Sequence, residues 1–342
     1  MGRKFRVQSS IVGVIVGLAC VAVLLREVDL KQSLQALGHL SGPFMLVPLA
    51  VFLLNLPLRA WRWQLIFPSS SRPKFVLCLV LMGIGNMANF LLPGRAGDLA
   101  RCTLAGPSGS LIEGSRTLAT LAVEKVLDGL ALIGMVLFSV WALHPPAWVM
   151  GLVRTAMLIF GAALILLLFL RYRARSFIEA VRRGFRWIHL SSLEERFDAL
   201  LTSFSEGLSA ISSGEQLLIL MLLTGIIWIT EACLIWGLAG ALAMAVSLKS
   251  AVVVSAVLGL GFMIPAAPGG LGTYELFGTE ALKIVGIAAS SALALTVVIH
   301  AWVFVGNVLA GLILLAVKGV SLGQLRRQLS SGQAVEGDSV EC

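Results

Sequence analysis

The stretch NMANFLLPGRAGDLAR, residues Asn86–Arg101, ends a long apolar run with a Pro-Gly break and three charged side chains. A charge inside hydrocarbon is costly unless it is paired or hydrated, so charges at this position need a reason. A related stretch, PAAPGGLGTYE, occupies residues Pro265–Glu275 in the second half of the chain. Both contain Pro-Gly-x-x-Gly followed, directly or after two residues, by an acidic residue. The repetition predicts a chain built from two related halves.

The composition around these stretches is that of a polytopic membrane protein. Of 342 residues, 58% are hydrophobic and only 13% are charged, whereas roughly a quarter of the residues in soluble proteins are charged. Strand-type alternation is absent, so we expect an all-α protein. The net charge of +8 gathers in basic groups that flank apolar runs, which is the positive-inside pattern and not a surface for nucleic acid. The five cysteines show no paired spacing, so neither disulfides nor a metal site is expected.

Six apolar runs are read as full membrane spans, which need about 20 residues each. These runs are Ile11–Leu25, Pro43–Ile66, Thr117–Leu143, Trp148–Leu170, Leu217–Met244 and Ala292–Val317. Basic residues before the first run and after the last predict that the N- and C-termini are both cytoplasmic. At the end of the second run, Arg59 and Arg62 are assigned to the cytoplasmic side, and Trp61 and Trp63 beside them to the membrane interface.

Two intervals between these spans are predicted to be re-entrant hairpins. Lys74 and Arg116 are both assigned to the cytoplasmic side, so the apolar interval between them must enter the membrane and turn back at its Pro-Gly break. The interval 247–291 starts and ends on the outer side, although Lys249 and Lys283 count against this assignment. The second hairpin is therefore entered from the opposite face. The two halves form an inverted repeat, an architecture typical of secondary transporters.

The predicted organisation has five parts. In chain order they are an N-terminal span with an outer link (1–42), a first half (43–170) with hairpin 75–116, a cytoplasmic amphipathic linker (171–216), a second half (217–320) with hairpin 247–291, and a disordered cytoplasmic tail (321–342). The linker is too small to be an enzyme domain.

Eight ionisable side chains in or beside the apolar runs are candidate substrate contacts: Arg95, Asp98, Arg101, Glu124, Lys125, Glu231, Glu275 and His300. The planar guanidinium of arginine matches a phosphate group, and a lysine adds a point charge. The carboxylates and the histidine can hold a cationic headgroup, relay protons or neutralise the arginines. Each has a structural alternative: a salt-bridge cluster for the hairpin charges and Glu124, a helix cap for Glu275, and a packed core position for His300.

The residues assigned to the two hairpin turns are Pro93, Gly94, Gly97, Pro268, Gly269, Gly270 and Gly272. The prolines break the helices and free backbone N–H groups, and a helix N-terminus favours phosphate. The glycines allow the backbone to approach a ligand or a neighbouring helix closely. We therefore expect the two turns to meet near the membrane midplane.

Four motifs in the same order resemble a known family. They are RAWRWQLI (Arg59–Ile66), NxxNFLLPGRAGDLAR (Asn86–Arg101), EKVLDG (Glu124–Gly129) and PGGLGTYE (Pro268–Glu275). The chain thereby resembles the flippase-like membrane family that includes the transmembrane region of lysyl-phosphatidylglycerol synthase/flippase proteins. Asp98 and Lys125 stand where the family commonly has Glu and Arg, and both changes keep the charge. The resemblance implies movement of a lipid with a polar or charged headgroup between leaflets.

These observations predict a lipid translocator, a flippase that moves a phospholipid or a polyprenyl-phosphate-linked lipid across the bacterial cytoplasmic (inner) membrane. Its expected partner is a membrane lipid with an anionic phosphate headgroup, and a homo-oligomer is left open. No catalytic residue, cofactor or metal is expected, and nothing after Lys318 is long enough for an aminoacyl-transferring domain. The ATP-binding pattern GxxxxGK[ST] is absent, so movement is expected to be downhill or coupled to an ion or a proton.

Two other functions stay open at this stage. An ion-coupled small-solute transporter would share the inverted repeat and the buried charges. A membrane-embedded lipid or glycosyl transferase would use Asp98 or Glu275 as a base. It would also need a large outer loop or a cluster of metal ligands, and the sequence has neither.

Overall fold

The computed structural model describes residues 43–69, 72–92, 96–104, 111–143, 146–187, 200–206, 208, 213–263 and 267–317. Within these ranges the regular structure is helical and contains no strand, which confirms the all-α prediction. The predicted N-terminal span, the turn residues Pro93 and Gly94, the candidate contact Arg95 and the predicted tail lie outside the described residues, as do both termini.

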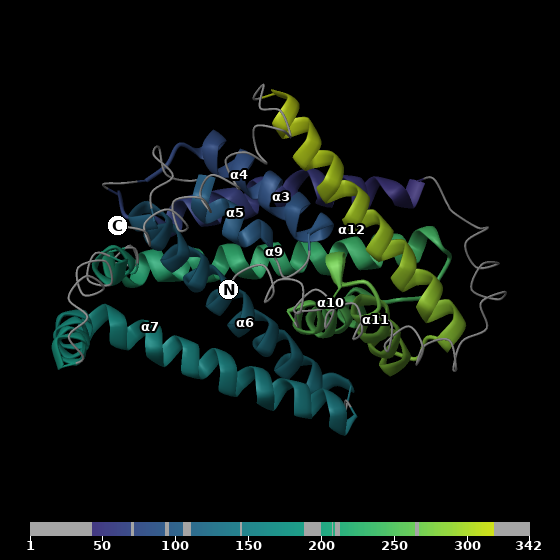
Figure 1. Cartoon of the computed structure of the whole chain (residues 1–342). Coiled ribbons are helices and arrows are strands. Elements are labelled where there is room, and N and C mark those ends of the chain that lie inside the picture. The colour runs from purple at the N-terminus through teal and green to yellow at the C-terminus, as the bar shows by residue number, and fades with distance from the viewer. Residues whose placement is uncertain are drawn as a thin grey trace.

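The described helices follow one another along the chain as Figure 1 shows. They are η2 (Pro43–Met45), α3 (Leu46–Ile66), α4 (Phe75–Leu91), α5 (Ala96–Leu104), α6 (Leu111–Leu143), α7 (Ala147–Trp187), α9 (Gly214–Ala241), α10 (Leu248–Phe262), η5 (Pro268–Gly270), α11 (Thr273–Ile284) and α12 (Ala289–Val317). Helix α9 crosses the middle of the view, with α3, α4 and α5 on one side of it and α10 and α11 on the other.

Three helices in the described part are long and apolar enough to cross a membrane: the segment Ala147–Arg173 of α7, helix α9 and helix α12. Helices α4 and α10 are equally apolar but shorter. Large apolar side chains point outward from α7 and α12, where Leu158 is 75% exposed and Ile313 61% exposed. Such side chains favour contact with lipid. The chain is a multi-pass helical membrane protein.

Each predicted hairpin interval contains two helices that pack on each other, α4 with α5 and α10 with α11. In the first pair, a Cβ atom on Gly97 would lie 1.8 Å from the carbonyl oxygen of Gly85, so only glycine lets α5 approach α4 this closely. In the second pair, Gly269, Gly270 and Gly272 have φ angles of 65°, 74° and 86°. This left-handed region favours glycine. Gly97, Gly269, Gly270 and Gly272 thus each occupy a position that requires glycine.

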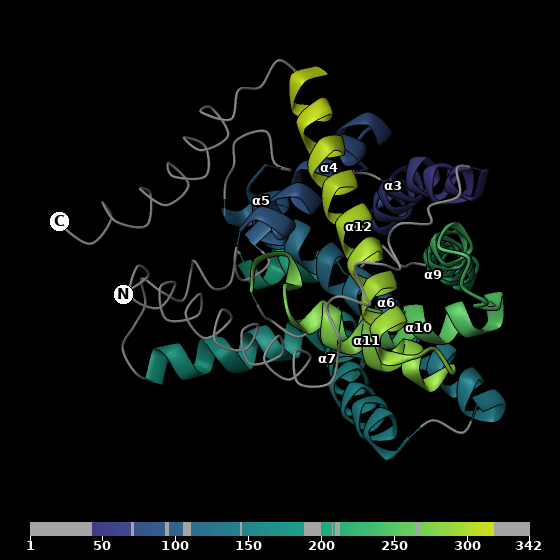
Figure 2. The same ribbon diagram turned by 90° about the vertical axis from the view of Figure 1, so that its right-hand side faces the viewer.

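The helix contacts fall into matching pairs. Helix α3 packs on α4 as α9 packs on α10, and α5 packs on α6 as α11 packs on α12. Between the halves, α4 packs on α12, α10 packs on α6, and α3 packs on α9. Figure 2 shows α12 standing against α4 at one end and against α11 at the other. Matching α3–α6 to α9–α12 therefore gives each of these contacts a counterpart.

Helix α7 runs through the start of the predicted linker as far as Trp187, with a break in helical geometry at Arg173 (φ −122°, ψ 19°). One local expectation is wrong. Trp63, assigned to the membrane interface, is fully buried, and its Nε1 atom donates a hydrogen bond to the hydroxyl of Thr120 at 3.0 Å. Helix α6 covers the face of α3 that carries Trp63, which the sequence of α3 alone does not reveal.

Candidate functional site

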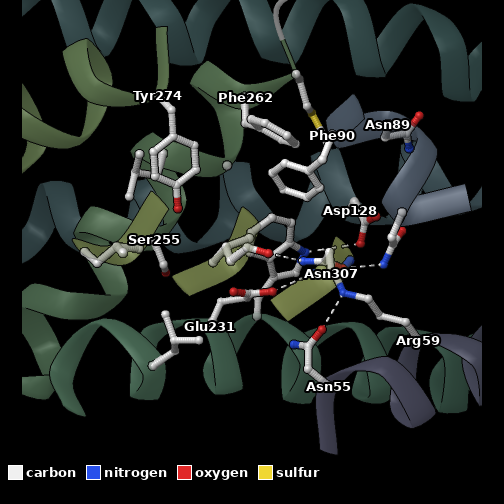
Figure 3. A pocket seen from close by; sticks show the side chains of 18 of the residues that line it. Asn55, Arg59, Asn89, Phe90, Asp128, Glu231, Ser255, Phe262, Tyr274 and Asn307 are labelled. Carbon is white, nitrogen blue, oxygen red and sulfur yellow. Dashed lines mark hydrogen bonds and ion pairs between the residues drawn. The ribbon is translucent and has the colours of Figure 1, made fainter. Parts of the chain in front are cut away.

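A cavity of about 170 Å³ lies among eight helices, α3 to α6 and α9 to α12. Its polar lining consists of Asn55, Arg59, Asn86, Asn89, Arg101, Glu124, Lys125, Asp128, Glu231, Ser255, Tyr274 and Asn307. Figure 3 shows the rings of Phe90 and Phe262 at one end of the cavity, and Asn55, Arg59 and Glu231 at the other. The cavity therefore joins a charged wall to an aromatic one.

The ion pair between Arg59 and Glu231 forms the wall between α3 and α9. Nη2 of Arg59 lies 2.9 Å from Oε1 of Glu231. Asn55 lies one turn before Arg59, accepts a hydrogen bond from its Nε at 2.7 Å, and donates one to Thr230 on α9 at 2.9 Å. The two charged side chains are 20% and 25% exposed. This pair is held in place but remains open to the cavity.

The ion pair between Arg62 and Asp128 is fully enclosed. Two guanidinium nitrogens of Arg62 reach the two oxygens of Asp128 at 2.6 and 3.2 Å. Thr224 accepts from the same guanidinium at 3.1 Å, and Trp228 donates its indole N–H to Asp128 at 3.2 Å. Arg62 has no exposed surface. The pair therefore ties α3, α6 and α9 together.

A second enclosed pair joins the first hairpin to α6. Nη2 of Arg101 lies 2.8 Å from Oε2 of Glu124, and Nη1 lies 3.3 Å from Oε1. The guanidinium carbon of Arg101 also lies 4.1 Å from the ring centroid of Trp63. Such stacking adds a cation–π contact to the ion pair. Arg101, a predicted phosphate contact, thus has a carboxylate partner and an aromatic platform already.

Lys125 is the most exposed cation of this network, with 31% of its side chain accessible. Its Nζ atom lies 3.4 Å from Oδ2 of Asp98 and 3.8 Å from Oε1 of Glu124. Asn89 on α4 holds Asp98 from both sides, because its amide donates to the carboxylate and accepts from the Asp98 backbone N–H, each at 3.2 Å. Lys125 and Asp98 therefore form a second partly exposed pair, of which Lys125 lines the cavity.

The described part of the network holds four cations and four anions in pairs of two kinds. Removing one partner of an enclosed pair is strongly destabilising, because a lone charge is then left in a medium of low dielectric. The Arg62–Asp128 and Arg101–Glu124 pairs are of this kind. The side chains of the Arg59–Glu231 and Lys125–Asp98 pairs are instead 18–31% exposed, so these pairs can exchange partners with a charged ligand.

His300 and Glu275 form a separate contact outside this network of ion pairs. Nδ1 of His300 lies 2.5 Å from Oε1 of Glu275, and Nε2 lies 2.9 Å from the carbonyl oxygen of Gly269. The other oxygen of Glu275 accepts the backbone N–H of Gly272 at 2.7 Å. Tyr274, which lines the cavity, stacks on the imidazole with ring centroids 4.4 Å apart. Glu275 is thus both a helix cap and a partner of His300.

The end of α4 packs against the turn of the second hairpin. The Phe90 ring stacks on Phe262 at 5.8 Å and meets Phe304 edge-on at 5.7 Å. A Cβ atom on Gly269 would lie 3.3 Å from the backbone oxygen of Phe90. The segment immediately before the first Pro-Gly break therefore touches the second Pro-Gly turn.

The structure brings the predicted site residues into two groups. Asp98, Arg101, Glu124, Lys125 and Glu231 belong to the network around the cavity, whereas Glu275 and His300 lie at the second turn. Sequence reasoning missed the cavity residues Asn55 and Arg59 and the buried Arg62. Their spacing of four and three residues places them on one face of a helix, a signal that the sequence does carry.

Asn86 and Asn307 were also missed as a pair. Asn86 on α4 donates its amide to the side-chain oxygen of Asn307 on α12 at 3.1 Å, and Asn307 donates in turn to the Val303 carbonyl at 2.8 Å. The bond links the first hairpin to the last helix at the edge of the cavity.

A family model described as "Lysylphosphatidylglycerol synthase TM region" matches residues 10–311. The matched range includes both Pro-Gly stretches and every charged residue of the network. No curated protein and no solved structure matches the chain.

Proposed function

The chain belongs to the family of the lysylphosphatidylglycerol synthase transmembrane region, whose members are membrane proteins with a lipid-related function, and from this premise we propose that it is a lipid translocator. It moves a lipid with a phosphate headgroup, a phospholipid or a polyprenyl-phosphate-linked lipid, between the leaflets of the bacterial cytoplasmic membrane. The lipid is not chemically converted on the way.

The observation that carries this proposal is a charged cavity inside an apolar helical protein. At about 170 Å³ it is smaller than the roughly 300–1,000 Å³ of sites that enclose a whole drug-sized ligand. A headgroup fits such a space, while acyl or prenyl chains do not. The chains therefore stay in the bilayer while the cavity replaces the water around the headgroup.

The two open ion pairs suit the binding of a phosphate group. When a phosphate displaces Glu231 from Arg59, or Asp98 from Lys125, the cation exchanges one anion for another and is never left alone. Arginine binds phosphate through two parallel N–H groups, so Arg59 is the principal contact in this proposal. Arg101 supports the site from behind through Glu124 and Trp63.

A smaller hollow of about 30 Å³ adjoins the cavity between α3 and α12. It shares Asn55, Glu231 and Asn307 with the cavity and reaches Phe52 on α3. Phe52 packs so closely on Gly306 of α12 that a Cβ atom there would lie 2.6 Å from its ring. In our proposal the lipid spans this seam between α3 and α12: its headgroup occupies the cavity, and its chains lie in the bilayer outside.

The matching helix contacts support two halves related as an inverted repeat. We propose about six full spans and two hairpins that enter from opposite faces, with both termini in the cytoplasm. In transporters of this architecture, one repeat or a part of it moves against the other around a central site. The cavity lies between the halves, since Arg59 and Glu124 come from the first and Glu231 and Tyr274 from the second.

The test is lipid movement by purified protein in proteoliposomes. Lipids with a fluorophore on one acyl chain and a natural phosphate headgroup are incorporated, and a membrane-impermeant quencher reports the outer leaflet. We expect wild-type protein to expose the inner-leaflet lipid to the quencher, and Arg59→Ala to reduce the rate about tenfold or more. Arg154→Ala, on the exposed face of α7, is the matched control and should behave as wild type.

Other outcomes discriminate between the functions. A labelled lipid that changes mass would establish a transferase, and uptake of a water-soluble solute without lipid movement would establish a small-solute transporter. If folded wild-type protein leaves phosphate-bearing lipids of every tested headgroup in their original leaflet, the proposal is wrong.

A further inference from the structure

The contacts among His300, Glu275 and Gly269 need one more proton than a neutral imidazole and an ionised carboxylate carry. Both ring nitrogens of His300 face oxygen atoms, at 2.5 Å for Glu275 and 2.9 Å for Gly269. A carbonyl oxygen and an ionised carboxylate can only accept hydrogen bonds, and a neutral imidazole has one N–H. Two contacts between acceptors and ring nitrogens need two protons, so an ionised Glu275 and a neutral His300 are one proton short.

We propose that Glu275 and His300 together bind one transported proton, which holds the Pro268–Gly270 turn against α12, and that its release frees this turn. The inference rests on the proposed lipid movement and names the proton as its coupling ion. With the proton bound, the pair has no net charge, as imidazolium with carboxylate or as imidazole with carboxylic acid. On release the proton passes to water, and the pair retains a charge of −1.

The elements that pack around this pair carry few other ionisable side chains. From α11, Tyr274 stacks on His300, while Glu280 pairs with Lys283 at 2.7 Å at the far end of the same helix. From α9, which also packs on α12, Glu231 lines the cavity together with Tyr274. Helix α4 packs on α12 as well, and its only ionisable side chain is Cys78.

The Pro268–Gly270 turn is bonded directly to this contact, so loss of the contact acts on the turn. Gly269 and Gly270 hold positive φ angles, and His300 is hydrogen-bonded to the carbonyl of Gly269 itself. Deprotonation places a ring lone pair against either the Gly269 carbonyl or the Glu275 carboxylate, so one contact becomes repulsive. The turn also touches Phe90, whose ring and that of Phe262 line the cavity. Releasing the turn therefore alters the aromatic end of the headgroup site.

The variant Glu275→Gln tests the proton count directly. A glutamine oxygen can still accept the Gly272 N–H, and its amide nitrogen can donate to Nδ1 of a neutral histidine, which keeps its Nε2–H for Gly269. In this variant the Pro268–Gly270 turn should therefore stay latched, that is, held against α12, at every pH. His300→Gln cannot bridge both partners, so the turn should be released at every pH. Glu280→Gln, on the same helix and outside this contact, should follow the wild type.

The readout is backbone hydrogen exchange of residues 267–276 in reconstituted full-length protein. The ratio of wild-type to Glu275→Gln exchange rates at the same pH removes the intrinsic pH dependence of exchange. We expect a ratio near one in acid that rises about tenfold in alkali, a coupling of ordinary size between two sites. A ratio that does not change between pH 5 and pH 9 overturns the proton site.

Transport measurements separate this inference from the proposed function. A pH-sensitive dye inside the proteoliposomes should report proton movement with labelled lipid in wild type, and Glu275→Gln should lose both the proton signal and the dependence of lipid movement on a pH gradient. Lipid movement that ignores the gradient and moves no protons overturns the coupling but leaves the translocator standing. A pH-dependent exchange ratio without lipid movement under any condition supports the latch and refutes the translocator.

Discussion

The enclosed pair of Arg62 and Asp128 gives the sharpest test of how the charges are stabilised. In Asp128→Ala, the guanidinium loses partners at 2.6 and 3.2 Å. It keeps only the Thr224 hydroxyl at 3.1 Å and Glu124 at 3.9 Å, while having no contact with solvent. Removing one partner of a buried pair typically costs about 3–5 kcal/mol. Replacing both with apolar residues, Arg62→Met with Asp128→Leu, should cost far less, because no lone charge remains.

The assay is thermal unfolding of the detergent-purified protein, followed by the loss of monodisperse material on heating. A loss of about 3–5 kcal/mol should lower the midpoint by roughly 6–20 °C, while the double variant should recover most of this shift. Arg116→Ala removes a cation from the solvent-exposed pair with Glu206 and serves as the control, with an expected cost of about 0–1 kcal/mol. A double variant as unstable as Asp128→Ala would refute the reasoning, since the cost would then lie in packing and not in the unpaired charge.

Three further variants test the other parts of the site. Gly97→Ala should prevent α5 from closing on α4, because its Cβ would meet the Gly85 oxygen at 1.8 Å; we expect little folded protein in size-exclusion chromatography, whereas Gly134→Ala, where nothing lies within 4 Å, should fold normally. Trp63→Phe removes the 3.0 Å hydrogen bond to Thr120 but keeps a ring beneath Arg101, so it should destabilise the protein by about 1–3 kcal/mol in the same melting assay. Lys125→Met should slow lipid movement while leaving the free energy of unfolding within about 1 kcal/mol of wild type. An unchanged transport rate would show that Lys125 is not part of the headgroup site.

Much of the fold can be predicted from the sequence because apolar runs and helix breakers act locally. Helices occupy the apolar runs within the described residues, and Gly97, Gly269, Gly270 and Gly272 occupy positions that require glycine. How the amphipathic segment after residue 171 joins α7 cannot be read from the sequence. A basic segment with apolar residues at helical spacing looks the same whether it extends a span or starts a new helix.

The site was predictable only for residues that break the apolar pattern within a run. Glu124, Lys125 and Glu231 stand out in this way, and all three line the cavity. Arg59 and Arg62 lie near the end of a run, where the positive-inside rule explains basic residues without any partner. Their partners Glu231 and Asp128 are 172 and 66 positions away. Such pairs depend on how helices from different parts of the chain pack, which the local sequence does not encode.

The division into enclosed and open pairs explains how one apolar protein can hold many charges and still change state. The enclosed pairs tie α3, α5, α6 and α9 into a unit, since Arg62 reaches Asp128 and Thr224 while Arg101 reaches Glu124. Arg59, Glu231 and Lys125 of the open pairs line the cavity, so a phosphate can replace a carboxylate as the partner of the cation, and the displaced carboxylate keeps its partly exposed surface. The second hairpin is held to α12 through His300 and Glu275, outside the tied unit. Motion confined to the element with the fewest enclosed ion pairs costs the least, and we therefore expect the hairpin of α10 and α11 to be the moving part.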